Sequence, residues 1–134
     1  MIEEIRFNED LWAIIVRDSF NRSGITFFTD NDSSQQLAYM SHAKGKIIQP
    51  HFHKPVPRAV DYTQEVLFIK SGKLRVDFYD HNRQKFDSRI LLKGDVILLS
   101  KGSHGFEVLE DLSMIEVKQG PYLGEQDKIK FEVK

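Results

Sequence analysis

The chain has 134 residues, of which 40% are hydrophobic and 29% are charged, and its formal net charge is −1 at pH 7. These values are typical of one globular domain with a hydrophobic core, which we expect to comprise residues 1–134. The balanced charge argues against nucleic acid and against an anionic membrane surface as partners. The absence of cysteine excludes disulfides and thiolate metal sites.

The N-terminus is acidic, and its apolar run Leu11–Val16 is too short for a signal peptide or a membrane span. A chain without cysteine also fits a reducing compartment. We therefore expect a cytoplasmic protein that inserts in no membrane.

Short segments rich in β-branched, aromatic or aliphatic residues alternate with turn signals along the chain. The predicted strands are residues 12–16, 24–28, 36–41, 45–53, 64–70, 73–79, 86–92, 96–99, 104–108 and 113–118. No long stretch shows the 3.6-residue period of a helix. Strands at this spacing predict an all-β sandwich or a closed antiparallel barrel.

Two histidines, His51 and His53, stand at positions i and i+2 of the predicted strand 45–53. Side chains at this spacing on a strand project from the same face, and Phe52 between them would point to the core or to an interface. Two neighbouring imidazoles are half of a site for a divalent metal. Residues 54–63 contain two prolines, so we expect a loop beside this pair.

Two later residues can complete the ligand set. Glu65 lies near the start of a predicted strand, and His104 follows the turn at residues 100–103. Three imidazoles and one carboxylate suit a divalent first-row metal such as zinc, iron, manganese or nickel, with positions open for water or substrate. Asp61 is an alternative source of the carboxylate.

This pattern resembles the two motifs of the cupin superfamily. The first comprises Gly45, five residues, His51-Phe52-His53, then Glu65, six residues and Gly72, with loop 54–63 as a longer gap than usual. In the second, Gly94 is followed after five residues by Ser100-Lys101-Gly102-Ser103-His104. Ser100 replaces the usual proline, one residue is missing before the histidine, and Val108 stands where asparagine is common.

The resemblance implies an antiparallel double-stranded β-helix of the jelly-roll type, with its barrel over residues 36–118 and a divalent metal held by His51, His53, Glu65 and His104. It also implies a homodimer, to which the strands within residues 1–35 would contribute by extending the sheet or the interface. The implied function is metal-dependent catalysis, as an isomerase or oxygenase, on a small polar metabolite. The C-terminal part is similar to small cupins encoded among surface-polysaccharide genes, which suggests a sugar-related substrate.

Two other functions fit the same residues. A metal-free sugar-nucleotide isomerase or epimerase would use the histidines as bases, and a small-ligand-binding cupin would catalyse nothing. Tyr62 is a candidate proton donor or a residue capping the barrel mouth. Arg58 is a candidate anion-binding group or a solvated loop residue.

Five further residues receive structural interpretations. Phe106 shares the parity of His104, which predicts either a pocket wall or barrel core. Glu116 and Lys118 alternate with Ile115 and Val117, which predicts that both charges lie on the outer, solvated face. His42 is expected on a surface strand and His81 in a turn.

Overall fold

The computed structural model describes residues 1–133 and confirms the all-β prediction, with 48% strand and 2% helix. The chain forms two compact units, and each is described by itself. Unit 1 comprises Met1–Phe20 and the chain from Tyr62 onward, and unit 2 comprises Asn21–Asp61. No helix among the described residues is long and apolar enough to cross a bilayer.

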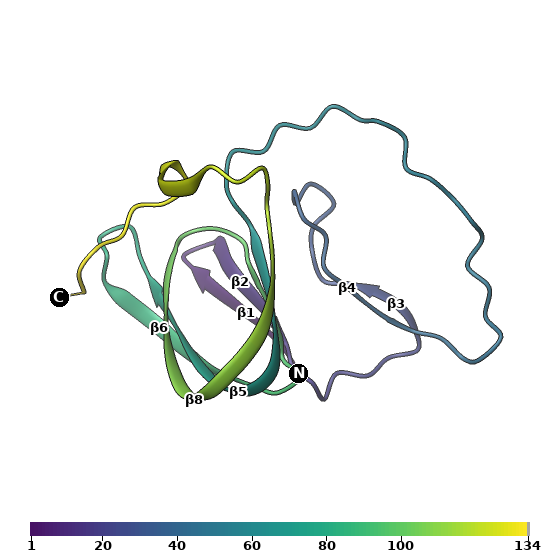
Figure 1. Ribbon diagram of the computed structural model, residues 1–134, viewed down its shortest axis with the longest axis horizontal. Helices are drawn as coiled ribbons and strands as arrows, with labels where there is room; N and C mark the ends of the chain where they lie inside the picture. The colour runs from purple at the N-terminus through teal and green to yellow at the C-terminus, as the bar shows by residue number, and fades with distance from the viewer. Residues whose placement is uncertain (134) are drawn as a thin grey trace. The chain divides into compact units, whose positions relative to one another are not determined.

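Unit 1 is built around one antiparallel sheet with the strand order β1-β2-β7-β5-β6, and β8 pairs with β5. The elements are β1 (Ile2–Phe7), β2 (Asp10–Val16), β5 (Glu65–Tyr79), β6 (Lys85–Leu92), β7 (Val96–Leu99), β8 (Ser103–Lys118) and a 3-10 helix, η1 (Gly124–Gln126). β5 pairs with β6, β7 and β8 along its length, and the sheet is curled into a half-barrel (Figure 1).

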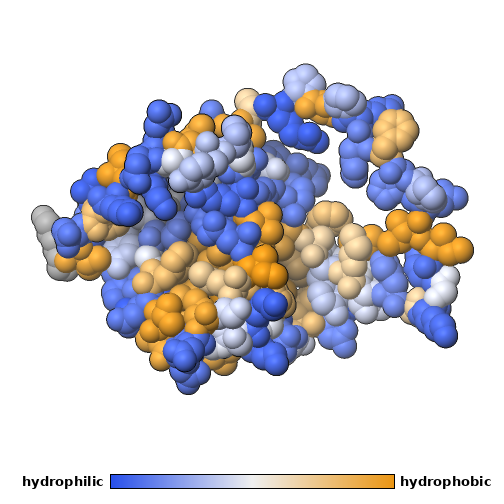
Figure 2. Space-filling view, viewed as in Figure 1, coloured by the Kyte–Doolittle hydropathy of each residue, from blue (hydrophilic) through white to orange (hydrophobic). Residues whose placement is uncertain are grey.

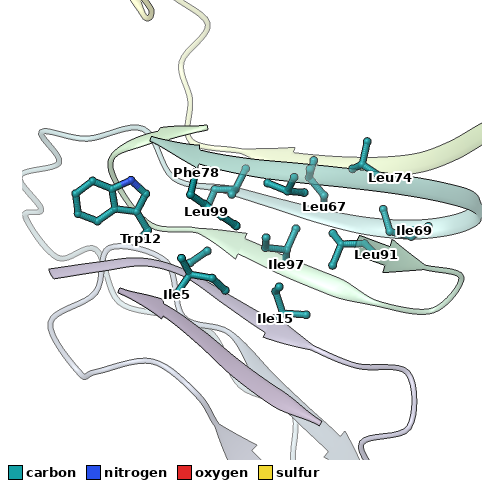
Figure 3. Close-up of a cluster of buried hydrophobic side chains, with 12 residues drawn as sticks. Ile5, Trp12, Ile15, Leu67, Ile69, Leu74, Phe78, Leu91, Ile97 and Leu99 are labelled. Atoms are coloured by element: carbon teal, nitrogen blue, oxygen red, sulfur yellow. The ribbon is translucent and has the colours of Figure 1, made fainter. Parts of the chain in front are cut away.

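The hydrophobic core of unit 1 lies on the inner face of this sheet. Alternate residues of β5, such as Leu67 and Ile69, are fully buried there, as the period of two in a strand requires. Figure 3 shows Ile5 of β1 and Ile15 of β2 facing the side chains of β5 and β7, with Trp12 at one end of the cluster. The N-terminal strands are therefore part of the core.

β5 and β8 are longer than predicted, because each joins two predicted strands. Residues 64–70 and 73–79 fall in one strand, as do 104–108 and 113–118. The turn signal at Ser71-Gly72 corresponds to a bend within β5, where the register with β8 shifts, and not to a reversal of the chain. Gly72 has φ +92°, and a Cβ there would lie 2.0 Å from the backbone oxygen of Asp111 on β8.

The outer face of the sheet carries an ionic cluster around Asp77, which is 6% exposed. Arg75 donates to both Asp77 carboxylate oxygens, at 3.0 and 3.1 Å, and the Ser88 hydroxyl donates at 2.6 Å. Burial alone would raise the pKa of Asp77, but the hydrogen bonds from Arg75 and Ser88 hold it below its usual value. The cluster therefore favours the ionised carboxylate and links β5 to β6.

Glu116 and Lys118, near the end of β8, do not lie on the outer face that their alternation with apolar residues predicted. Glu116 pairs directly with Leu67, and Lys118 pairs with Glu65, and directly paired residues project from the same face of a sheet. Both charges are therefore on the inner face, beyond the apolar core. Ile115 and Val117 lie on the other face and are 50% and 58% exposed, so the prediction of an outer face for Glu116 and Lys118 was wrong. Figure 2 shows hydrophobic residues in orange among hydrophilic ones on the visible surface.

Unit 2 contains one antiparallel hairpin, β3 (Gly24–Phe27) with β4 (Ala38–Ser41). The side chain of Gln36 closes its loop by donating to the carbonyls of Asp30 and Ser33. No strand follows in residues 42–61, so the strand predicted over 45–53 is absent. Pro50 has no amide hydrogen for a ladder, and two further prolines follow at 55 and 57. Phe52 is 84% exposed and not in a core.

Substituting Gly72→Ala tests the bend between β5 and β8. We expect a loss of about 3 kcal/mol in the free energy of unfolding, from the positive φ and from the contact with Asp111. The matched control is Gly105→Ala on β8, whose Cβ would meet Tyr79 at an ordinary 3.6 Å. Urea denaturation measures both variants, and equal stabilities would contradict the role of Gly72.

Substituting Asp77→Asn tests the ionic cluster. At neutral pH we expect a loss of about 2 kcal/mol, because hydrogen bonds to a charged group are lost. A carboxylate with a lowered pKa stabilises the fold above its unfolded value, near 3.8, and this contribution disappears as the pH falls through the folded pKa. The wild type should thus converge on the variant below about pH 4 in denaturation curves. A constant difference down to pH 2 would refute the assignment.

Candidate metal centre

The curl of the sheet brings together two predicted ligands, Glu65 at the start of β5 and His104 near the start of β8. In the register of this strand pair, His104 lies opposite Phe78, at the far end of β5 from Glu65. Along a flat strand the thirteen steps from Glu65 to Phe78 would span roughly 43 Å. In the curled sheet, His104 Nε2 lies only 4.0 Å from Glu65 Oε1.

The connection between β7 and β8 fixes His104 beside Glu65. Glu65 pairs with Leu99, the last residue of β7, and a short turn then leads to His104. Trp12 holds this turn, because its carbonyl accepts from the amide of Ser100 at 2.8 Å and its indole donates to the Tyr79 carbonyl at 3.0 Å. Gly102 has φ +82°, and a Cβ there would lie 2.0 Å from the Trp12 ring.

Both side chains are largely shielded, with 18% of Glu65 and 24% of His104 exposed. Burial and the neighbouring carboxylate of Glu116 raise the pKa of Glu65, while Lys118 opposes this shift. Burial lowers the pKa of His104, so its imidazole is neutral at pH 7 and keeps a free lone pair. A neutral imidazole is the form that ligates a metal or accepts a proton.

Phe106 stands next to His104 on the same face of β8. The ring centroids are 5.3 Å apart, and Phe106 is 41% exposed. This exposure of the Phe106 side chain excludes barrel core, one of the two roles predicted for it. The ring offers an apolar surface beside the imidazole of His104.

The other predicted ligands, His51 and His53, belong to unit 2. Their ring centroids are 5.4 Å apart although no strand aligns them. His51 Nδ1 lies 2.8 Å from the carbonyl oxygen of Gln49. Since a carbonyl only accepts, Nδ1 donates to it, an arrangement that also orients many metal-binding histidines.

The distance between Glu65 and His104 is close to that between two ligands of one ion. At 4.0 Å their atoms are too far apart for a direct hydrogen bond. Two donors bound at about 2.0–2.2 Å to a tetrahedral ion lie about 3.4 Å apart, so a small rotation of either side chain would bring the pair into ligand geometry. In the described residues 1–133, no three His, Asp or Glu side chains form a group that could hold a metal. The two ligand pairs lie in different units.

The remaining candidates are exposed. Tyr62 is 66% exposed, with the Lys101 ammonium 6.0 Å from its ring centroid. Arg58 and Asp61 are exposed residues of unit 2, whereas Glu65 is half-buried beside His104. His42 is exposed, and His81 lies in a turn as predicted, with its ring 5.4 Å from that of Trp12.

Sequence reasoning missed a second ionic group next to Glu65. The hydroxyl of Thr63 donates a short hydrogen bond to Asp127, and Lys118 Nζ lies 3.4 Å from the same carboxylate. Lys118 pairs directly with Glu65 across the strands. The alternating pattern of residues 115–118 places Lys118 on the same face as Glu116, so the sequence did contain a signal for the position of Lys118. No local sequence pattern connects Asp127 to β5 or β8.

Comparison with family models, curated proteins and solved structures finds no match to this chain.

Proposed function

We propose that this protein binds a divalent metal through His51, His53, Glu65 and His104 in a cupin-type barrel and acts on a small polar metabolite. The 4.0 Å separation of Glu65 Oε1 and His104 Nε2 carries the proposal. This pair comes from strand pairing in unit 1, whereas the participation of His51 and His53 rests on the sequence pattern. The cupin-type barrel likewise rests on the motif spacing and on the curled sheet.

The residues around the pair define what the site offers a ligand. Glu65 supplies an anionic oxygen and His104 a neutral nitrogen, which together suit zinc, iron, manganese or nickel. When bound, such an ion would polarise a carbonyl or enolate oxygen of the substrate. Phe106 places an apolar ring beside His104, and Lys118 adds a cation close to Glu65. This mixture fits a polar metabolite that carries an oxygen ligand.

A metal-free isomerase or epimerase is the second candidate function. The observation that favours it is the same pair, because a shielded neutral imidazole next to a carboxylate can also accept and return a proton. In that case His104 is the base, and the Glu65 carboxylate stabilises its protonated form. The two functions differ in whether the protein requires a metal.

Metal content and zinc affinity test the first proposal. Untagged protein from metal-replete cells should contain about one metal ion per chain by elemental mass spectrometry. Glu65→Gln keeps the shape of the side chain but removes its charge, and we expect it to weaken zinc binding at least about tenfold in a competition titration. The double variant His51→Asn, His53→Asn should lose stoichiometric metal.

The matched control is the double variant His42→Asn, His81→Asn, which removes the same number of imidazoles outside the proposed set. It should bind zinc as the wild type does, with circular dichroism confirming that all variants are folded. Wild-type protein without metal would reject the metal centre. Equal losses in the control and in the His51, His53 variant would show that zinc binds surface histidines unspecifically.

A further inference from the structure

The C-terminal segment Gly120–Val133 leaves the end of β8 and returns along unit 1. It contains η1 and is drawn in yellow in Figure 1. Most of its large apolar residues remain in solvent: Tyr122 is 87% exposed, and Ile129 is 83% exposed. The segment therefore gains little stability from hydrophobic burial, and such segments open at low cost in free energy.

Two side chains join this segment to the sheet in the described part of the chain. The first is Asp127, whose carboxylate accepts from the Thr63 hydroxyl and lies 3.4 Å from Lys118 Nζ. Thr63 precedes Glu65 by two residues, and Lys118 pairs with Glu65. This contact therefore lies at the Glu65 end of the candidate centre. The hydrogen bond from Thr63 lowers the pKa of Asp127, so the contact favours the ionised carboxylate.

The second is Phe131, which packs edge-on against Tyr79 at 5.5 Å between centroids and lies under the guanidinium of Arg83 at 5.2 Å. Tyr79 pairs with Ser103, the neighbour of His104. Successive residues of a strand face opposite sides of the sheet, so this contact lies beside His104 but on the outer face. Residues 127–131 run between the two contacts.

We propose that Gly120–Val133 is a strap across the sheet edge beside the Glu65–His104 pair, held shut by the contact of Asp127 with Thr63 and Lys118, and that it opens to admit ligand. The biological purpose of the strap rests on the proposed function, but its geometry does not. Asp127 is a positioning residue that acts through the strap. The anchor at Phe131 allows the segment to hinge without leaving the protein.

The accessibility of His104 tests the strap without any metal. Diethyl pyrocarbonate modifies neutral imidazoles, and peptide mass spectrometry gives the rate at His104 alone. Asp127→Asn should raise this rate about tenfold, the change expected when a charge-assisted hydrogen bond is lost from a two-state opening. Phe131→Ala, which frees the other anchor, should also raise it.

The matched control is Glu125→Gln, which removes one negative charge from an exposed residue of the same segment. It should leave the rate at His104 unchanged, and the rate at exposed His42 should be equal in all variants. Equal rates at His104 in the wild type, Asp127→Asn and Phe131→Ala would overturn the strap. A faster rate in the control as well would assign the effect to charge and would also overturn it.

A zinc titration of the same proteins separates this proposal from the proposed function. If zinc binds, Asp127→Asn should speed its association by a similar factor. If zinc does not bind but His104 becomes more reactive in Asp127→Asn, the metal centre fails and the strap stands. If zinc binds and the reactivity of His104 is the same in all variants, the strap fails and the metal centre stands.

Discussion

The pairing of β5 with β8, and the bend that this pair makes at Gly72, determine both the core and the candidate site. Without the bend, the two ends of β5 would lie too far apart for Glu65 to approach His104. The register matters equally, because a shift by one residue would turn Leu67 and Glu65 to the outer face together. Core and site thus depend on the same hydrogen-bonded ladder, so that damage to the ladder far from His104 also reaches the site.

The inner face of this sheet changes character along its length. Leu67 and Ile69 are fully buried, whereas the end of the same face carries Glu65, Glu116 and Lys118. Two carboxylates close together, one of them partly buried, repel each other, which costs folding free energy unless a cation compensates. Lys118 provides part of this compensation, and a bound divalent cation would provide more. Sites of this kind commonly sacrifice stability for binding.

Most strand positions in unit 1 could be predicted from sequence because their apolar runs are clear, as in Val96–Leu99, whereas β1 (Ile2–Phe7), in which half of the residues are charged, was missed. The bend could not, since a glycine signal does not distinguish a kink from a chain reversal. Alternation shows that Glu116 and Ile115 lie on opposite faces, but not which face is inner. The strand over 45–53 was predicted from its histidine spacing in spite of Pro50. The contact of Asp127 with Thr63 joins residues far apart in the chain, and only tertiary structure reveals it.

The position of Trp12 has a practical consequence. It is the only tryptophan in the chain, it is 1% exposed, and it holds the turn that leads to His104. Its indole hydrogen bond and the close approach of Gly102 make its surroundings sensitive to small displacements of that turn. The intrinsic fluorescence of the unlabelled protein is therefore a built-in optical reporter of events at His104, with no competing indole elsewhere.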